Sequence, residues 1–199
     1  MVMLEHEILQ SVLKPARYTG GEWNAVRKNH GEVACTFALA LPDVYEVGMS
    51  NLGLAILYGI LNAREDTAAE RVYAPWTDME REMREHHIPL FSLESHEEIR
   101  KFDFLGFSLQ YEMVFSNVLN MLDLAGIPLF AKERSEEMPF VVGGGPCAYN
   151  VEPVTDFFDF FVIGEGEAVL GEVVDVFAAW KGEGKPDGRR GFLERLRAP

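Results

Sequence analysis

Two kinds of hydrophobic pattern alternate along the chain. Short, continuous apolar runs, such as the one that ends at Leu41, are typical of strands covered on both faces. Longer segments between them place apolar residues at helical spacing. Strands are expected at 32–41, 70–76, 102–110, 138–145 and 158–167. Helices are expected at 4–13, 51–64, 77–87, 114–126 and 167–180.

Local signals refine the boundaries of these elements. Asn51 or Ser50 is a suitable N-cap for the helix that follows the first strand, and Thr77 for the next one. Gly126 is expected to close the helix at 114–126. The stretch 88–95 is expected to form a small extra strand.

Strands that alternate with helices predict an α/β domain built on a parallel sheet. We expect a Rossmann-like, flavodoxin-like sheet of five strands in the order 2-1-3-4-5, with an N-terminal helical arm. The expected divisions are an arm at 1–31, the α/β domain at 32–181, and a linker with a short basic helix at 182–199.

Composition narrows the possible partners. The chain has 32 acidic and 18 basic residues and a net charge of −14, which argues against a basic nucleic-acid-binding face. Cys35 and Cys147 are far apart and predict no disulfide framework, as in a cytoplasmic protein. No apolar run is long enough to predict a membrane span or a signal peptide.

Four polar or glycine-rich stretches follow expected strands and can meet at one edge of the sheet. They are Asp43–Gly48, Ser108–Gln110, Gly143–Gly145 and Gly164–Glu167. Each alone also has an ordinary structural interpretation, because such loops and serine–backbone hydrogen bonds are common. Glu165 either caps the next helix or binds a ligand hydroxyl.

The other motifs are weaker. Residues 143–148 fit GxGxxA, with Glu165 about 20 residues further on, but prolines leave no room for the long helix that a dinucleotide fingerprint needs. His86 and His87 have no partners at metal-ligand spacing, so no metal site is expected. No catalytic motif is present.

In order, the motifs resemble those of cobalamin-binding domains, namely DxHxxG, SxL and GG. The chain offers Asp43-x-Tyr45-x-x-Gly48, then Ser108-Leu109, then Gly143-Gly144-Gly145. The stretch 159–167 resembles the segment that precedes the barrel in cobalamin-dependent radical S-adenosylmethionine (SAM) enzymes. With stretches such as 37–62 and 144–154, it resembles an uncharacterised subfamily of these proteins.

The resemblance implies a slot for the cobalamin nucleotide tail at the carboxyl edge of the sheet. Ser108 would face the displaced benzimidazole, and Gly143 and Gly144 would line the slot. Asp43 would steady its loop, and Gly48 would leave space beside the corrin.

Two departures modify this expectation. Tyr45 replaces the histidine that binds cobalt, and a phenol with a pKa near 10 is a poor ligand at neutral pH. The family's CxxxCxxC motif is absent, so an iron–sulfur cluster and SAM would belong to a C-terminal barrel on the same or another chain. This chain alone is expected to be catalytically inert. Two alternatives remain, a docking module that has lost the cofactor and a nucleotide- or flavin-binding domain.

Overall fold

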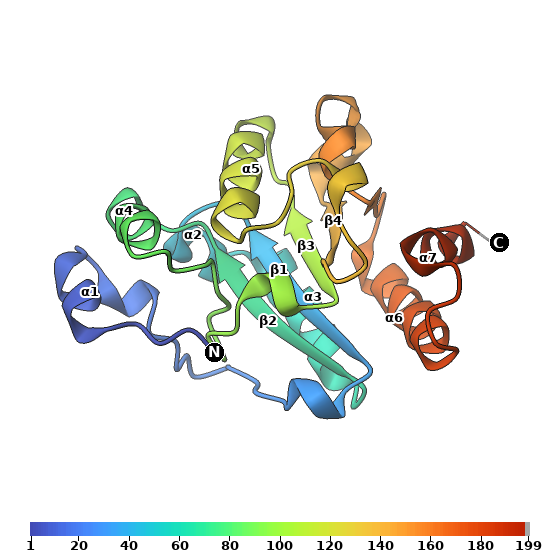
Figure 1. Cartoon of the computed structure of the whole chain (residues 1–199), viewed down its shortest axis with the longest axis horizontal. Helices are drawn as coiled ribbons and strands as arrows, with labels where there is room; N and C mark the ends of the chain where they lie inside the picture. Colours follow the sequence, from blue (N-terminus) through green and yellow to red (C-terminus); the bar gives the residue numbers. More distant parts are fainter. Residues whose placement is uncertain (198–199) are drawn as a thin grey trace.

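The structure is a computed structural model that describes residues 1–197, and its centre is a five-stranded parallel sheet (Figure 1). The strand order is β2-β1-β3-β4-β5, as the sequence predicts. The strands are β1 (Cys35–Leu41), β2 (Thr67–Tyr73), β3 (Phe104–Ser108), β4 (Phe140–Gly144) and β5 (Phe160–Phe161).

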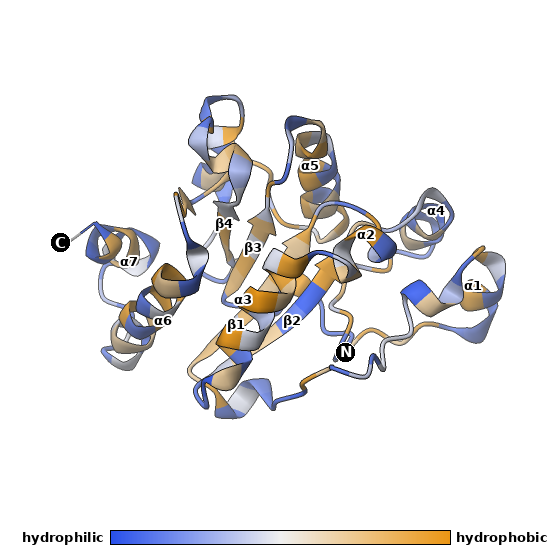
Figure 2. Cartoon of the chain, turned by 180° about the vertical axis from the view of Figure 1, so that it is seen from behind, coloured by the Kyte–Doolittle hydropathy of each residue, from blue (hydrophilic) through white to orange (hydrophobic). Residues whose placement is uncertain are grey.

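Helices cover both faces of the sheet. Side chains alternate along β1, so that Ala38 and Ala40 face one core, while Phe37, Leu39 and Leu41 face the other. The first core is completed by α4 (Thr77–Glu85) and α5 (Phe115–Leu124). The second is completed by α3 (Leu52–Ala63), α6 (Gly166–Gly182) and α7 (Gly188–Leu196). Figure 2 shows how hydrophobic β1 and β3 are, and also a hydrophilic stretch within β2.

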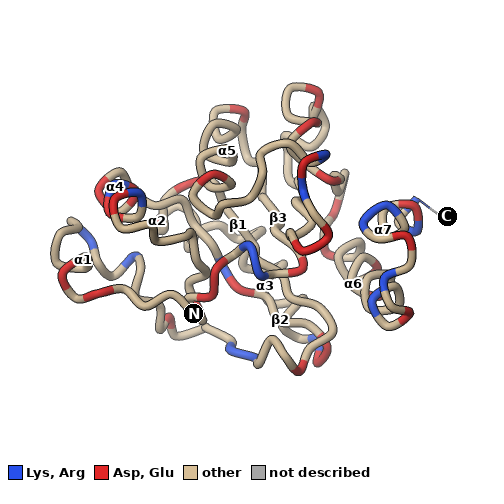
Figure 3. The backbone as a smooth tube through the Cα atoms, in the orientation of Figure 1, with Lys and Arg blue, Asp and Glu red and all other residues tan. Residues whose placement is uncertain are grey.

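The second core is largely aromatic. The ring of Phe104 lies 4.9 Å from that of Phe37 and 4.8 Å from that of Phe177. Phe192 of α7 is fully buried in the same cluster, 5.7 Å from Phe104. Although Lys and Arg colour much of α7 in Figure 3, this basic helix is therefore packed onto the domain.

The N-terminal segment lies at the β2 side of the sheet and is anchored to it. It contains α1 (His6–Ser11) and two 3-10 turns, Pro15–Arg17 and His30–Glu32. Ile8, Val12 and Tyr18 are buried in the first core. The Lys28 ammonium donates hydrogen bonds to the carbonyls of Asn62, Arg64 and Thr67, so this part of the arm is fixed against α3 and β2.

The remaining elements are short. They are α2 (Tyr45–Met49) and the 3-10 turns Ile99–Lys101, Glu112–Val114, Ala131–Glu133, Pro146–Tyr149 and Glu152–Phe157. The last two turns confirm that no long helix follows the glycines of β4. Within residues 1–197, no helix combines the length and apolarity needed to cross a membrane.

Several local predictions are confirmed and others are wrong. The Asn51 side chain caps α3 by accepting a hydrogen bond from the Leu54 amide, and Gly126 adopts φ +65° just after α5. Thr77 is not an N-cap, because α4 already begins there and Trp76 is the cap residue. The stretch 88–95 forms only an isolated bridge between Phe91 and Glu98, because its backbone turns back on itself.

Candidate functional site

A cleft of about 400 Å³ opens at the carboxyl edge of the sheet, on the face covered by α3 and α6. Its floor is made by strands β1, β3 and β4. One wall is the first part of α3, and the opposite wall is the start of α6. The lining includes Phe37, Leu39, Asn51, Leu54, Gly106, Ser108, Gln110, Gly143, Gly144, Gly145, Gly164, Glu165 and Glu167.

This position follows from the strand order. The connection after β1 leads to β2 on one side, and the connection after β3 leads to β4 on the other side. The chain therefore leaves neighbouring strand ends in opposite directions, and a crevice opens between them. Ligands of open α/β sheets bind at such switch points.

The three consecutive glycines have different structural roles. A Cβ on Gly143 would meet the Phe161 ring at 2.5 Å, so this glycine makes room for packing. Gly145 adopts φ +94° and turns the chain, which side chains tolerate poorly. A Cβ on Gly144 would meet nothing closer than a carbonyl at 3.8 Å. Gly144 is therefore the one of the three whose missing side chain leaves space in the cleft.

Ser108 lies on the cleft floor at the end of β3. Its hydroxyl accepts a 2.7 Å hydrogen bond from the Gln110 amide, which orients both groups at the lining. Leu109 does not line the cleft and is fully buried. Its backbone amide donates to the Gly144 carbonyl at 2.7 Å, and its carbonyl accepts from the Cys147 amide. Leu109 thus holds the glycine turn in place from below.

The wall at α6 carries the acidic groups of the cleft. Glu165 is the N-cap residue of α6, but its side chain makes no capping hydrogen bond. Gly164 adopts φ +105°, with open space around it, and lets the chain turn into the helix. Glu165 and Glu167 are both exposed, so the carboxylates are free to meet hydroxyl or amide donors of a bound molecule.

The stretch Asp43–Gly48 does not line the cleft, unlike the other three strand-end stretches. The Asp43 carboxylate accepts hydrogen bonds from the Val44 amide and from the Tyr111 hydroxyl, at 2.7 and 2.9 Å. A Cβ on Gly48 would lie 2.1 Å from the Tyr73 ring, so this glycine is needed for packing within the protein.

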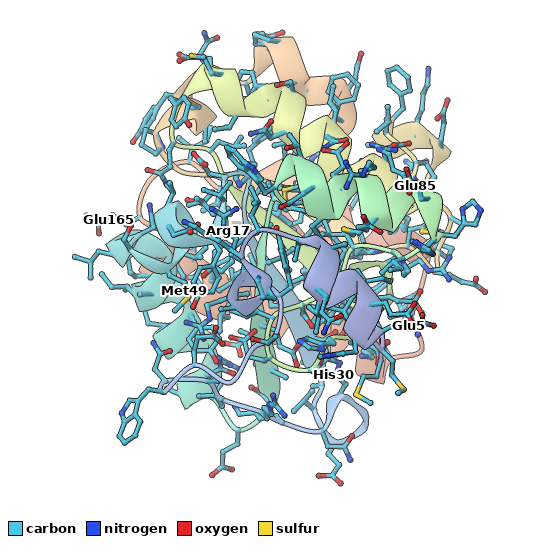
Figure 4. All side chains as sticks on the ribbon, turned by 90° about the vertical axis from the view of Figure 1, so that its left-hand side faces the viewer. Glu5, Arg17, His30, Met49, Glu85 and Glu165 are labelled. Atoms are coloured by element: carbon cyan, nitrogen blue, oxygen red, sulfur yellow. The ribbon has the colours of Figure 1, made fainter. Side chains whose placement is uncertain are left out.

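Tyr45 points away from the cleft, toward the N-terminal segment. Its hydroxyl donates a 3.0 Å hydrogen bond to Glu22, and its ring meets the Tyr73 ring edge-on. Burial and this hydrogen bond raise the pKa of Tyr45 above 10, so the phenol is neutral at physiological pH. In Figure 4, Arg17 and Met49 lie near the middle of this side of the molecule and Glu165 lies at its margin.

The surroundings of Tyr45 are closely packed and charged. Arg71 and Glu94 form an ion pair at 2.6 Å, with side chains only 5% and 0% exposed. The cavity beside Tyr45 and Arg71 measures about 30 Å³, which is room for a water molecule but not for a cofactor.

The cysteines cannot serve one metal cluster. Cys35 begins β1 at the amino edge of the sheet, whereas Cys147 follows β4 at the carboxyl edge. Burial raises the pKa of both thiols and so favours the protonated form. The thiolate is the form that binds metals, and a protonated thiol is a poor ligand.

Sequence reasoning missed the wall that α3 contributes. Asn51, Gly53 and Leu54 line the cleft, although they look like an ordinary helix start. The sequence did contain a signal for this wall. The first turn of α3 contains a glycine and follows the end of β1, and the helix after β1 must cover the face on which the cleft lies.

The fold and the cleft together define a Rossmann-like α/β domain whose cleft lies where such sheets bind ligands. The family model described as "Radical SAM proteins, N-terminal" matches residues 53–198. The chain therefore belongs to the family of N-terminal domains of radical SAM proteins.

One similar protein is much longer than this chain. The chain is similar to the "Uncharacterized protein MJ0966" of Methanocaldococcus jannaschii, with 25% identity over 142 residues, which is 69% of this chain. The match covers 26% of that relative, so the chain spans about a quarter of its length.

Proposed function

We propose that this chain is a cobalamin-binding-like domain of a radical SAM protein, and that the cleft receives the nucleotide tail of cobalamin. The observation that carries the proposal is that Ser108 and the open position at Gly144 share one cleft. Membership in the family supports the radical SAM part of the proposal. The iron–sulfur cluster and SAM would be held by a barrel domain elsewhere in the parent protein.

The cleft residues fit the tail of such a molecule. The apolar floor of Phe37 and Leu39 suits a flat heterocycle, and the glycines allow it to approach the backbone. The Ser108 hydroxyl and the Gln110 amide offer donors for ring nitrogens or phosphate oxygens. Glu165 can accept hydrogen bonds from ribose hydroxyls.

The proposed mode has no protein ligand below cobalt. Tyr45 is neutral, bonded to Glu22 and outside the cleft lining, so it is unsuited to coordinate a metal. When bound, the corrin would supply methyl-transfer or redox chemistry to the parent protein. This chain would hold and orient the corrin.

The test is retention of hydroxocobalamin or methylcobalamin on gel filtration at micromolar protein. The wild-type chain should co-elute with corrin absorbance. Gly144→Leu should abolish co-elution, because its Cβ position lies in the cleft, with no protein atom nearer than the Val162 carbonyl at 3.8 Å, and a longer side chain would occupy the space of the ligand. Gly59→Leu is the matched control, because Gly59 is exposed on α3, away from the cleft, with nothing within 4 Å of its Cβ position. Loss of binding in both variants, or in neither, would contradict the assignment of the cleft.

The alternatives give different results in the same assay. A docking module without cofactor would retain no corrin. The volume of the cleft argues against this alternative. A nucleotide- or flavin-binding domain would retain no corrin but would show a thermal shift with nucleotides. The 3-10 turn Pro146–Tyr149 argues against the second alternative, because it stands where a dinucleotide fold needs a helix N-terminus.

A further inference from the structure

The two outer strands of the sheet, β2 and β5, differ in the hydrogen bonding of their outer edges. Along β2, the backbone of Arg71 is bonded on its outer side, because its carbonyl accepts from the Leu93 amide and its amide donates to the Glu94 carboxylate. For β5, the only strand partner within residues 1–197 is β4. The outer edge of β5 is therefore an open template for another strand.

A groove of about 290 Å³ runs along this open edge. It is lined by Asp159, Phe160, Phe161, Val162 and Ile163 in succession, and by residues of α6 and α7. Successive side chains of a strand point to opposite faces, so contact with five successive residues means that the groove follows the strand edge. Ile163 in the groove is 60% exposed.

The end of α7 forms the far wall of this edge groove. Leu193, Leu196 and Arg197 line it, and α7 is held rigidly to the sheet. Arg189 donates hydrogen bonds to the Met138 carbonyl at 2.6 Å and to the Asp159 carboxylate at 2.7 Å. The last residue that the structure describes, Arg197, therefore lies at the groove.

We propose that the segment of the parent polypeptide after residue 199 adds a sixth strand to β5 and places apolar side chains in the edge groove. The inference rests on the proposed function, because it takes the parent protein to continue beyond this domain. In the M. jannaschii relative, about three quarters of the polypeptide lies outside the matched region.

The handedness of the fold sets the direction of this strand. The connection from β1 to β2 runs over the α3 face, and the connection from β3 to β4 runs over the opposite face, so both have the same hand. A parallel strand outside β5, reached through α6 and α7 on the α3 face, would need the opposite, left-handed crossover, which is very rare. The sixth strand is therefore antiparallel, a common arrangement at the edge of parallel sheets.

Hydrogen exchange measured by mass spectrometry on residues 1–199 and on the protein encoded by the complete reading frame tests the inference. Amides of residues 160–163 should exchange at least roughly tenfold more slowly in the longer protein, except that of Val162, which already donates to the Gly143 carbonyl of β4. Ile163→Lys in the longer protein should restore fast exchange, because a charge on the edge opposes pairing. Leu13→Lys, at a more exposed apolar position on the arm, should leave the exchange slow.

Three results would overturn the inference. They are equal exchange in both proteins, a reading frame that ends at residue 199, and protection already present in a dimer of the 199-residue chain. Corrin binding is scored separately. Retained corrin with an unprotected edge overturns only the sixth strand, and a protected edge without corrin overturns only the proposed function.

Discussion

The carboxyl edge of the sheet is open on one side and closed on the other. The cleft beside Gly144 measures about 400 Å³ and is lined by glycines, polar side chains and an apolar floor. The cavity beside Tyr45 measures about 30 Å³ and is lined by large aromatic and charged side chains. The loop that begins at Asp43 belongs to the closed side, although its sequence resembles part of a ligand site.

The comparison shows that a glycine in a motif can serve either ligand binding or internal packing. Gly144 leaves space for a ligand, whereas Gly48 leaves space for the Tyr73 ring. The closed side owes its rigidity to the buried Arg71–Glu94 pair and to the N-terminal segment packed over it. Substitutions on the closed side should change stability, and those on the open side should change binding.

The largest effect is expected from breaking the buried ion pair. Glu94→Gln should lower the free energy of unfolding by about 3–5 kcal/mol, because Arg71 keeps its charge in a buried site after losing its carboxylate partner. Urea denaturation monitored by far-UV circular dichroism measures this loss.

Glu46→Gln is the matched control for this substitution. Glu46 also accepts hydrogen bonds from basic side chains, Lys14 and Arg17, but its side chain is 43% exposed. Exposed pairs contribute at most about 1 kcal/mol, so the midpoint should move little. Equal effects of the two substitutions would show that the Arg71–Glu94 pair is not desolvated.

The same substitution at the two glycines should separate the two sides. Gly48→Ala should destabilise the fold by about 1–3 kcal/mol, because the new methyl group overlaps the Tyr73 ring, which also contacts Tyr45 and Met49. Gly144→Ala should leave thermal stability unchanged or raise it by about 0.5 kcal/mol, because open space surrounds its Cβ position. Calorimetric melting curves of the two variants measure the difference. Similar losses at both positions would mean that the cleft is packed in solution.

The fold was accessible from the sequence because its signals are local. Continuous apolar strands, amphipathic helices and the Asn51 cap are each encoded within a few residues, and their alternation predicts a parallel sheet. The order 2-1-3-4-5 is one of the two common orders of such sheets. The extent of β5 was less accessible. Its apolar run is long, but only Phe160 and Phe161 pair with β4, because the chain turns away at Gly164.

The candidate site could be predicted only in part, because it depends on contacts between positions that are distant in the sequence. Sequence reasoning brought Ser108, Gly143–Gly145 and Glu165 to one edge, and the structure places all of them at the cleft. It could not foresee that Tyr45 turns toward Glu22, because that contact joins positions 23 residues apart. Nor could a motif reveal that α3 supplies a wall, since this depends on how the helix packs on the sheet.

A pH-dependent contribution is expected from the closed side. His30 lies 2.8 Å from the buried Glu70 carboxylate, and this hydrogen bond raises the pKa of His30 above 6.5. The stabilisation is therefore complete below about pH 6.5 and is lost as the pH rises through the higher pKa of the folded state.

The difference in unfolding free energy between wild type and His30→Gln should therefore be larger at pH 6 than at pH 9. The comparison with the variant is needed because burial lowers the pKa of His96, which gives the opposite slope. The gap between the two proteins should narrow at high pH. A gap independent of pH would mean that His30 acts only through packing.

A small loss of stability is expected at Tyr45, where a substitution tests whether this residue belongs to the open or to the closed side. Tyr45→Phe keeps the edge-on contact with Tyr73 and removes the hydroxyl bonded to Glu22, so stability should fall by about 0.5–1 kcal/mol. Corrin retention should not change, because Tyr45 lies outside the cleft lining. Stability from urea titration and corrin absorbance after gel filtration are measured on the same sample. If the corrin were lost while stability stayed the same, Tyr45 would belong to the ligand site, and the separation of the edge into an open and a closed side would be wrong.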